Sequence, residues 1–146
     1  MEEHQKWIEK CIRMAVDNTK QGQDPFAAVV VKDGEEVASG VNDGKAAFDP
    51  TAHGEIRALQ AAGRALESRD LSGCVLYTNC EPCPMCYAAI FWSGITDVYY
   101  GLSVAEQNAF DDKPQQLYDE LRKDPGERSI QPKAVETAMD PMAPFE

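Results

Sequence analysis

Two short stretches decide how this chain is interpreted: Thr51-Ala52-His53-Gly54-Glu55 and Pro82-Cys83-Pro84-Met85-Cys86. They supply one imidazole and, thirty positions after it, the first of two thiols that lie three residues apart. An imidazole and two thiolates are good zinc ligands, and three protein ligands leave the fourth tetrahedral position free for water. We therefore expect one zinc ion per chain, bound by His53, Cys83 and Cys86 at a centre that is open to chemistry.

Glu55 is better suited to moving protons than to binding this metal. Residues i and i+2 do not share a helical face, so His53 and Glu55 can reach one site only from the very start of a helix. Zinc lowers the pKa of bound water, and a neighbouring carboxylate can take up the proton and later protonate a departing amine. The combination predicts a hydrolytic site with Glu55 as its catalytic residue. A zinc-stabilised scaffold without activity is the alternative, and it leaves Glu55 without a role.

The pattern His-x-Glu followed by Pro-Cys-x-x-Cys resembles the signature of zinc-dependent nucleobase deaminases. The chain is similar to the cytidine deaminase-like superfamily and, within it, to bacterial guanine deaminases. The likeness extends over about residues 1–130 and is densest at residues 25–26, 40–42, 49–53 and 78–86. It implies a hydrolase that acts on a cyclic amidine C–N bond of a free nucleobase, with guanine converted to xanthine and ammonia as the first choice.

The run Phe110-Asp111-Asp112 favours guanine. In guanine deaminases the second Asp of such a run assists proton transfer, so the resemblance assigns this role to Asp112. The alternative is that both Asp residues cap the following helix. His-Gly-Glu also occurs in fungal cytosine deaminases, and Phe145 is the last aromatic residue where similar enzymes close the pocket with a C-terminal aromatic segment. Cytosine, an aminotriazine or a nucleoside therefore stay open as substrates.

The resemblance also implies a binding site for the base. The candidate substrate-binding residues are Asn42, Phe26, Gly54 and Trp92. The Asn42 amide can donate to and accept from the edge of a base, and Phe26 and Trp92 can form aromatic walls. Asn42 can equally be a turn residue, and Trp92 can equally belong to the core.

Hydrophobic periodicity and turn residues predict alternating helices and strands. The expected elements are a helix at 2–20, strands at 26–31 and 35–41, a helix at 52–67 with Thr51 as its N-cap, a strand at 73–78, a helix from 82 or 83 to 93, a strand at 95–100, a helix at 114–123 and a strand at 130–135. This order predicts an α/β fold, a three-layer α/β/α sandwich around a central mixed five-stranded sheet of the cytidine deaminase-like type. We expect residues 1–146 to form a single deaminase domain.

Composition limits the classes of partner that the chain is expected to bind. The formal net charge of −11 argues against extended nucleic-acid binding and therefore against a deaminase that acts on tRNA adenosine. The sequence has no apolar run long enough for a membrane span and no signal peptide, so a cytoplasmic protein is expected. Cys11, Cys74 and Cys80 are expected to be buried free thiols. The resemblance implies a small nucleobase as ligand and a homodimer, in which C-terminal segments can be exchanged.

Overall fold

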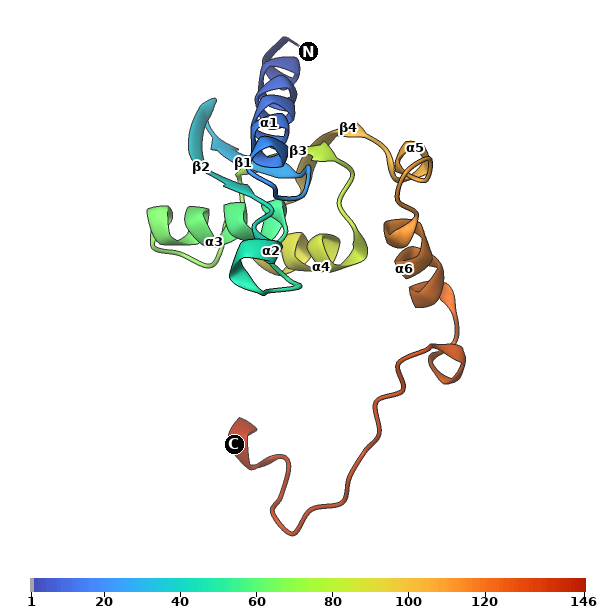
Figure 1. Cartoon of the computed structure of the whole chain (residues 1–146). Coiled ribbons are helices and arrows are strands. Elements are labelled where there is room, and N and C mark those ends of the chain that lie inside the picture. The colour runs from blue at the N-terminus through green and yellow to red at the C-terminus, as the bar shows by residue number, and fades with distance from the viewer. Residues whose placement is uncertain (1) are drawn as a thin grey trace.

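The computed structural model describes residues 2–146, which form an α/β fold with an extended C-terminal arm (Figure 1). The elements in chain order are α1 (Glu2–Lys20), β1 (Ala27–Lys32), β2 (Glu35–Val41), α2 (Gly44–Ala47), α3 (Gly54–Leu66), β3 (Val75–Cys80), α4 (Pro84–Ser93), β4 (Asp97–Leu102), α5 (Val104–Gln107), α6 (Lys113–Arg122) and two 3₁₀ turns at Pro125–Glu127 and Ala143–Phe145. Every element predicted up to residue 123 is present. The predicted loop at 42–50 additionally contains the single turn α2.

The sheet is mixed, with strand order β2-β1-β3-β4. β1 pairs with β2 and with β3 in antiparallel fashion, and β3 pairs with β4 in parallel. Within residues 2–146 the sheet has four strands, so the expected fifth strand at 130–135 is wrong. Pro132 interrupts that segment and cannot donate a ladder hydrogen bond, and Ile130 and Val135 are 78% and 79% exposed. The segment lies in the arm and leaves β4 as the edge of the sheet.

Helices cover both faces of the sheet, as the three-layer prediction requires. On one face α1 packs Trp7 and Cys11 against Val29, Val31 and Tyr77. On the other face α3 and α4 form a second cluster with the strands, made of Ala28, Val30, Ala58, Ala62, Leu76 and Ile90, with Leu71, Cys74 and Ile95 from the connections. β1 is therefore buried on both sides, which explains its uninterrupted run of apolar residues.

The two helices that carry the metal-ligating motifs begin directly after a ligand. His53 and Cys83 have extended backbone angles and occupy the N-cap positions of α3 and α4. Thr51, the expected N-cap of α3, instead donates from its main-chain N–H and its hydroxyl to the Asp49 carboxylate, and so belongs to the preceding turn. At the other end of α4, Gly94 adopts φ 85° and terminates the helix as predicted.

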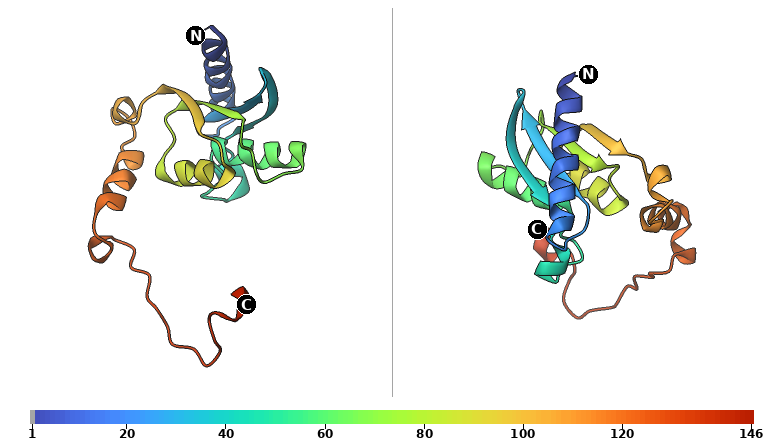
Figure 2. Two further views of the ribbon diagram at one scale, coloured as in Figure 1. Left: turned by 180° about the vertical axis from the view of Figure 1, so that it is seen from behind. Right: turned by 45° about the horizontal axis from the view of Figure 1, so that its top comes forward.

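After β4 the chain leaves the sheet. α5 follows β4 and contacts α6, α6 contacts α4, and residues from 123 onward form an arm that extends away from the body (Figures 1 and 2). Its large apolar side chains are 60–80% exposed: Ile130, Val135, Met139, Met142 and Phe145. Within residues 2–146 none of the helices has the length and apolar character that crossing a membrane would require. Cys11, Cys74 and Cys80 are buried free thiols, as expected.

Candidate active site

His53, Cys83 and Cys86 meet where the N-termini of α3 and α4 converge. The His53 Nδ1 atom lies 3.7 Å from the Cys83 Sγ and 3.5 Å from the Cys86 Sγ. All three potential ligand atoms lie within 4.8 Å of one another. Tetrahedral zinc, with Zn–S near 2.3 Å and Zn–N near 2.0–2.1 Å, requires N···S separations of about 3.6 Å. The donor set and its spacing therefore fit zinc with three protein ligands.

Local electrostatics favours a thiolate at this position. A hydrogen bond from the Cys86 thiol, followed by the one shared with His53, lowers the pKa of Cys83 to about 4. Cys83 and Cys86 belong to the N-cap and first turn of α4, where the helix dipole also stabilises negative charge. The deprotonated form is the one that binds metal, so the Cys83 thiol is prepared for a cation, whereas its hydrogen bond to Cys83 and its burial raise the pKa of Cys86.

Glu55 lies in the first turn of α3 and is only 6% exposed. Burial raises the pKa of its carboxyl group, while the nearby His53 imidazole acts in the opposite direction. A carboxyl group with a raised pKa can hold and release a proton near neutral pH. His53 and Glu55 are two residues apart and can still face one site, because His53 precedes the helix and Glu55 is its second residue, as expected from the sequence.

The metal-ligating residues open into a pocket of about 500 Å³, a size typical of small-molecule sites. Phe26, Asn42, His53, Glu55 and Cys83 contribute to its walls. Gly54 lies behind them, where a Cβ atom would be 3.0 Å from the Ala27 Cα and 3.2 Å from the Phe26 carbonyl oxygen. Gly54 therefore allows α3 to pack closely against the segment that carries Phe26.

Residues 1–102 match the family model described as the cytidine and deoxycytidylate deaminase zinc-binding region. The chain is 37% identical to the guanine deaminase of Bacillus subtilis, over 98% of this chain and 92% of that protein. The chain belongs to the cytidine and deoxycytidylate deaminase family. The match agrees with the spacing of the three ligands, so the cofactor is zinc.

Two further comparisons describe the relatives of this deaminase. A crystal structure of the Bacillus subtilis guanine deaminase superposes with a TM-score of 0.90 and 34% identity, over 97% of this chain and 90% of that one. A probable cytosine deaminase of Schizosaccharomyces pombe is 36% identical over 97 residues, which are 66% of this chain and 59% of that protein. The guanine deaminase thus matches beyond β4, where the family model ends.

The deaminase family model ends before the remaining wall of the pocket, which comes from residues 107–117. Asp111 lines the pocket, and its Oδ1 atom accepts a hydrogen bond from the Lys113 main-chain N–H. Asp112, the residue expected to assist proton transfer, is the N-cap residue of α6, and its carboxylate accepts from the Gln116 side chain. Within residues 2–146 the structure brings Asp111 rather than Asp112 into the lining.

Trp92 does not join the other candidate substrate-binding residues. Its side chain is 84% exposed on α4 and borders a different groove, between α3 and α4. Because α4 starts at the metal site and Trp92 is its ninth residue, more than two helical turns separate the two. In this deaminase Trp92 is therefore not a wall of the pocket of its own chain.

The structure also identifies residues that sequence patterns did not indicate. The Tyr118 hydroxyl on α6 donates to the Pro82 carbonyl oxygen at 2.7 Å and so links the outer wall to the start of α4. Asp24 lines the pocket next to Phe26 and pairs with Lys45 at 3.3 Å. Neither residue belongs to a motif, and only their place in the fold connects them to the site.

Proposed function

We propose that the protein is a zinc-dependent hydrolytic deaminase of a free nucleobase, which converts guanine and water to xanthine and ammonia. One observation carries the proposal: three zinc ligands at tetrahedral spacing open into a pocket in which the buried carboxyl group of Glu55 lies beside them. When bound, zinc supplies Lewis acidity that activates water for attack on an amidine carbon. A purely structural site would need neither the pocket nor Glu55.

In this reaction Glu55 transfers the protons. When water adds to the amidine carbon, Glu55 takes one of its protons and delivers it to a ring nitrogen. Loss of ammonia then requires the second proton, which Glu55 takes from the hydroxyl group of the adduct and delivers to the amino group. A single carboxyl group can make these transfers in turn if it stays close to the reacting carbon. Glu55 meets this condition because it is fixed in the first turn of α3 and is excluded from bulk water.

Asn42 recognises the base as a hydrogen-bond donor. Its Oδ1 atom accepts from the Gly44 main-chain N–H at 3.0 Å, and a main-chain N–H can only donate, so this contact fixes the orientation of the amide. The Nδ2 group is the part that is left for a ligand, and it matches an acceptor such as a ring nitrogen or carbonyl oxygen. Phe26 packs against the plane of the base, and Gly54 keeps this side of the pocket close to α3.

The wall formed by residues 107–117 supports guanine over other bases. It carries the Phe110-Asp111-Asp112 run and lies outside residues 1–102, the region that the family shares. We assign a supporting role in proton transfer to this pair of acidic residues. Asp111 is the member that lines the pocket, so Asp111→Asn should lower kcat more than Asp112→Asn.

The experiment that tests the function is ammonia release by the zinc-loaded protein from guanine, guanosine, cytosine, cytidine, adenine, adenosine and ammeline. Glu55→Gln is the catalytic blank, and Glu67→Gln, at the other end of the same helix, is the matched control. Turnover of guanine well above the other compounds, lost in Glu55→Gln with zinc retained, supports the proposal. Preferred turnover of another base refutes guanine, and no turnover of any base refutes the small-base assignment.

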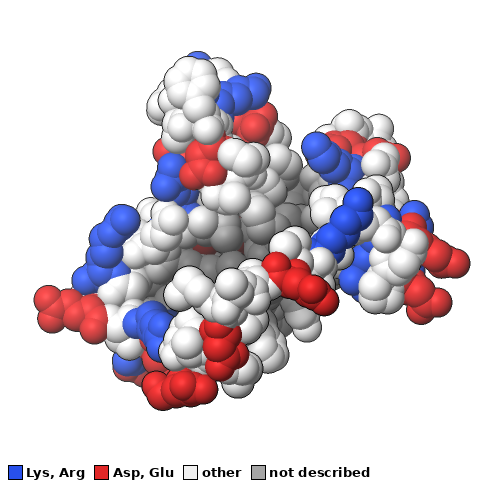
Figure 3. Space-filling view, turned by 90° about the horizontal axis from the view of Figure 1, so that it is seen from below, with Lys and Arg blue, Asp and Glu red and all other residues white. Residues whose placement is uncertain are grey.

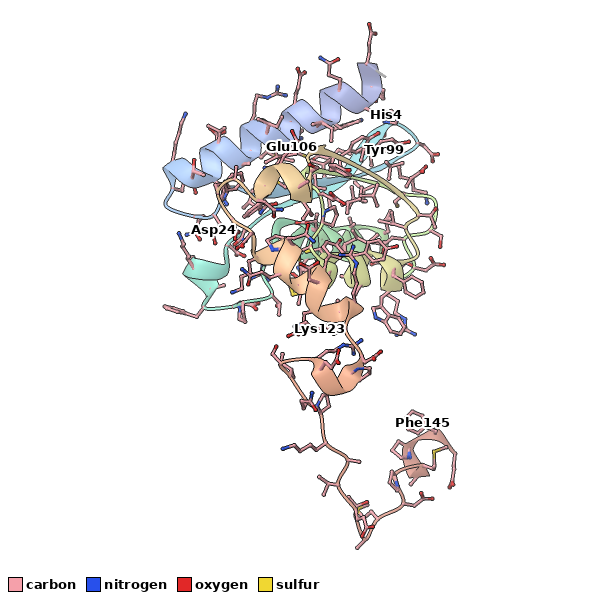
Figure 4. All side chains as sticks on the ribbon, turned by 90° about the vertical axis from the view of Figure 1, so that its right-hand side faces the viewer. His4, Asp24, Tyr99, Glu106, Lys123 and Phe145 are labelled. Atoms are coloured by element: carbon pink, nitrogen blue, oxygen red, sulfur yellow. The ribbon has the colours of Figure 1, made fainter. Side chains whose placement is uncertain are left out.

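We further propose a homodimer in which C-terminal arms are exchanged. The arm exposes its apolar side chains, and Figure 4 shows Phe145 at its tip, far from the ribbon that carries Asp24. The edge strand β4 borders a groove of about 680 Å³ lined by Tyr87, Ile90, Phe91, Val98, Tyr100 and Tyr118. An arm from a second copy would cover this groove and bury both apolar surfaces.

Sedimentation of the full chain and of a variant truncated after Lys123 tests the exchange. The full chain is expected to sediment as a dimer and the truncated chain as a monomer. A truncated chain that remains dimeric would show that the arm does not hold the subunits together.

A further inference from the structure

A network of asparagine side chains fixes the two strand ends that form the base-binding wall. Asn18, in the last turn of α1, is 5% exposed. Its Nδ2 group donates to the Asp24 carbonyl oxygen at 2.7 Å and to the Asn42 carbonyl oxygen at 2.8 Å. One amide thus connects the residue before Pro25-Phe26 with Asn42, the residue that follows β2.

Asn79 holds the same segment through two further hydrogen bonds. At the end of β3, its Oδ1 atom accepts from the Ala27 main-chain N–H and its Nδ2 group donates to the Pro25 carbonyl oxygen, both at 2.9 Å. The residues on each side of Phe26 are therefore bound to one side chain. Both bonds join the segment around the start of β1 to β3, the strand that leads to the Cys83 and Cys86 motif.

The main chain of Phe26 and Asn42 closes the network. The Asn42 N–H donates to the Phe26 carbonyl oxygen at 3.0 Å, and the Phe26 N–H donates to the Asp24 carbonyl oxygen at 2.9 Å. Asp24, Phe26 and Asn42 all line the pocket, whereas Asn18 and Asn79 do not contribute to its lining within the described residues 2–146. Figure 4 shows Asp24 beyond the C-terminal end of α1, next to α2.

From this geometry we infer that Asn18 and Asn79 are positioning residues for base recognition. They fix the relative place of the Phe26 ring and the Asn42 amide, the two groups that the proposed function assigns to the base, and they do so without touching the base. The inference rests on that proposed function for its kinetic consequence. Its structural part, the restraint of the Asn42 main chain, can be measured independently.

The kinetic test compares Asn18→Ala and Asn79→Ala with the wild type. Each variant is expected to raise KM about tenfold, the effect of one hydrogen bond, with kcat changed less than about threefold and zinc content unchanged. Ser93→Ala is the matched control, because the Ser93 hydroxyl is a buried group that also donates to a main-chain carbonyl, that of Ile90, but lies at the far end of α4. It should lower the Tm without raising KM.

A double-mutant cycle separates an effect of Asn18 on the position of Asn42 from a general loss of stability. If Asn18 acts through Asn42, its substitution should raise KM by less than about threefold in an Asn42→Ala background. A full tenfold effect in that background, or a KM for Asn18→Ala equal to that of Ser93→Ala, would overturn the inference. The assay uses whichever base the wild type deaminates, so a failure of the guanine assignment does not affect it.

Amide hydrogen exchange provides the readout that needs no turnover. In Asn18→Ala, exchange of the Asn42 N–H should be faster than in Ser93→Ala by about tenfold, because the main chain at Asn42 loses its hydrogen bond from the Asn18 side chain. Equal exchange rates in the two variants would overturn the inference. If the wild type deaminates no base while Asn42 exchange responds as expected, the proposed function fails and the restraint stands.

Discussion

Gly40→Ala should push α3, the helix that begins after the ligand His53, away from the sheet. Gly40 lies in β2, where a Cβ atom would be 2.4 Å from the Ala58 main-chain nitrogen and 2.7 Å from the Gly54 carbonyl oxygen. Both atoms belong to the backbone of α3, so the clash cannot be relieved by a change of rotamer. To restore ordinary contact, α3 would have to move away from β2 by about 1 Å.

This displacement has a cost in stability and a cost in metal binding. Overpacking of this kind destabilises by about 1–3 kcal/mol, which for a chain of this size lowers the Tm by about 3–10 °C. The start of α3 also carries His53, and metal–ligand distances tolerate only about 0.2 Å of error. We therefore expect zinc affinity to fall by at least about tenfold, a larger effect than destabilisation alone would produce.

Thermal denaturation with and without zinc, together with zinc competition against a chromogenic chelator, measures both effects. Gly126→Ala is the matched control, because within the described residues its added Cβ atom would meet nothing within 4 Å. It should leave both the Tm and the zinc affinity unchanged. If Gly40→Ala kept the Tm and zinc affinity of Gly126→Ala, the close packing of α3 on β2 would not hold His53 in place, and the reasoning would be refuted.

Two other predictions concern the cysteines. Cys86→Ser should lose zinc on dialysis while the far-ultraviolet circular dichroism stays close to that of the wild type, and retained stoichiometric zinc would contradict the assigned ligand set. Burial raises the pKa of Cys11 to about 12 and that of Cys80 to about 11, from 9.0. The folded state thus holds these protons more tightly than the unfolded state. The contribution of the two thiols to the free energy of unfolding is therefore fully present below pH 9. It falls as pH rises toward 11–12, by up to about 1.4 kcal/mol per pH unit for each thiol. Urea unfolding between pH 8 and 10.5 should show this decline, with a smaller slope in Cys11→Ala; an unchanged slope would count against it.

The helices and strands up to residue 123 could be predicted because local signals agree with packing. The apolar run of β1 indicated a strand covered on both faces, and Gly94 ends α4 with the positive φ that glycine adopts easily. The strand expected at 130–135 failed because apolar residues alone do not provide a partner. Whether Ile130 and Val135 pair with β4 depends on where the arm goes, which composition and periodicity do not determine.

The surface charge bears on the class of partner that the chain can bind. On the face shown in Figure 3, and within the described residues, Lys and Arg side chains are interspersed with Asp and Glu and form no continuous basic surface. On this face the distribution offers no continuous track for a phosphate backbone, and the absence of nucleic-acid binding stays a prediction from the net charge of −11. A small uncharged base needs no such surface.

The metal ligands were easier to predict than the base-binding residues because zinc accepts few side chains and imposes their spacing. A base can be bound by many polar and aromatic groups, so Trp92 was a reasonable candidate and is nevertheless far from the pocket. Nothing in the sequence around Asn18 pointed to the site, and Asn79, although it belongs to the 78–86 stretch, had no predicted role. The structural role of these residues arises from contacts between positions that are 24 and 52 residues apart. Such contacts exist only after folding.

The ligand positions show how the fold accommodates its function. His53 and Cys83 occupy N-caps, yet within the described residues neither side chain caps its helix. A Ser, Thr or Asp at an N-cap typically stabilises a helix by about 1 kcal/mol, so α3 and α4 each give up that contribution. Zinc binding offsets the loss, because ligands on both helices bind one ion and binding adds directly to folding free energy. Without metal, each of the two helix ends at which the chemistry takes place therefore lacks one stabilising contribution.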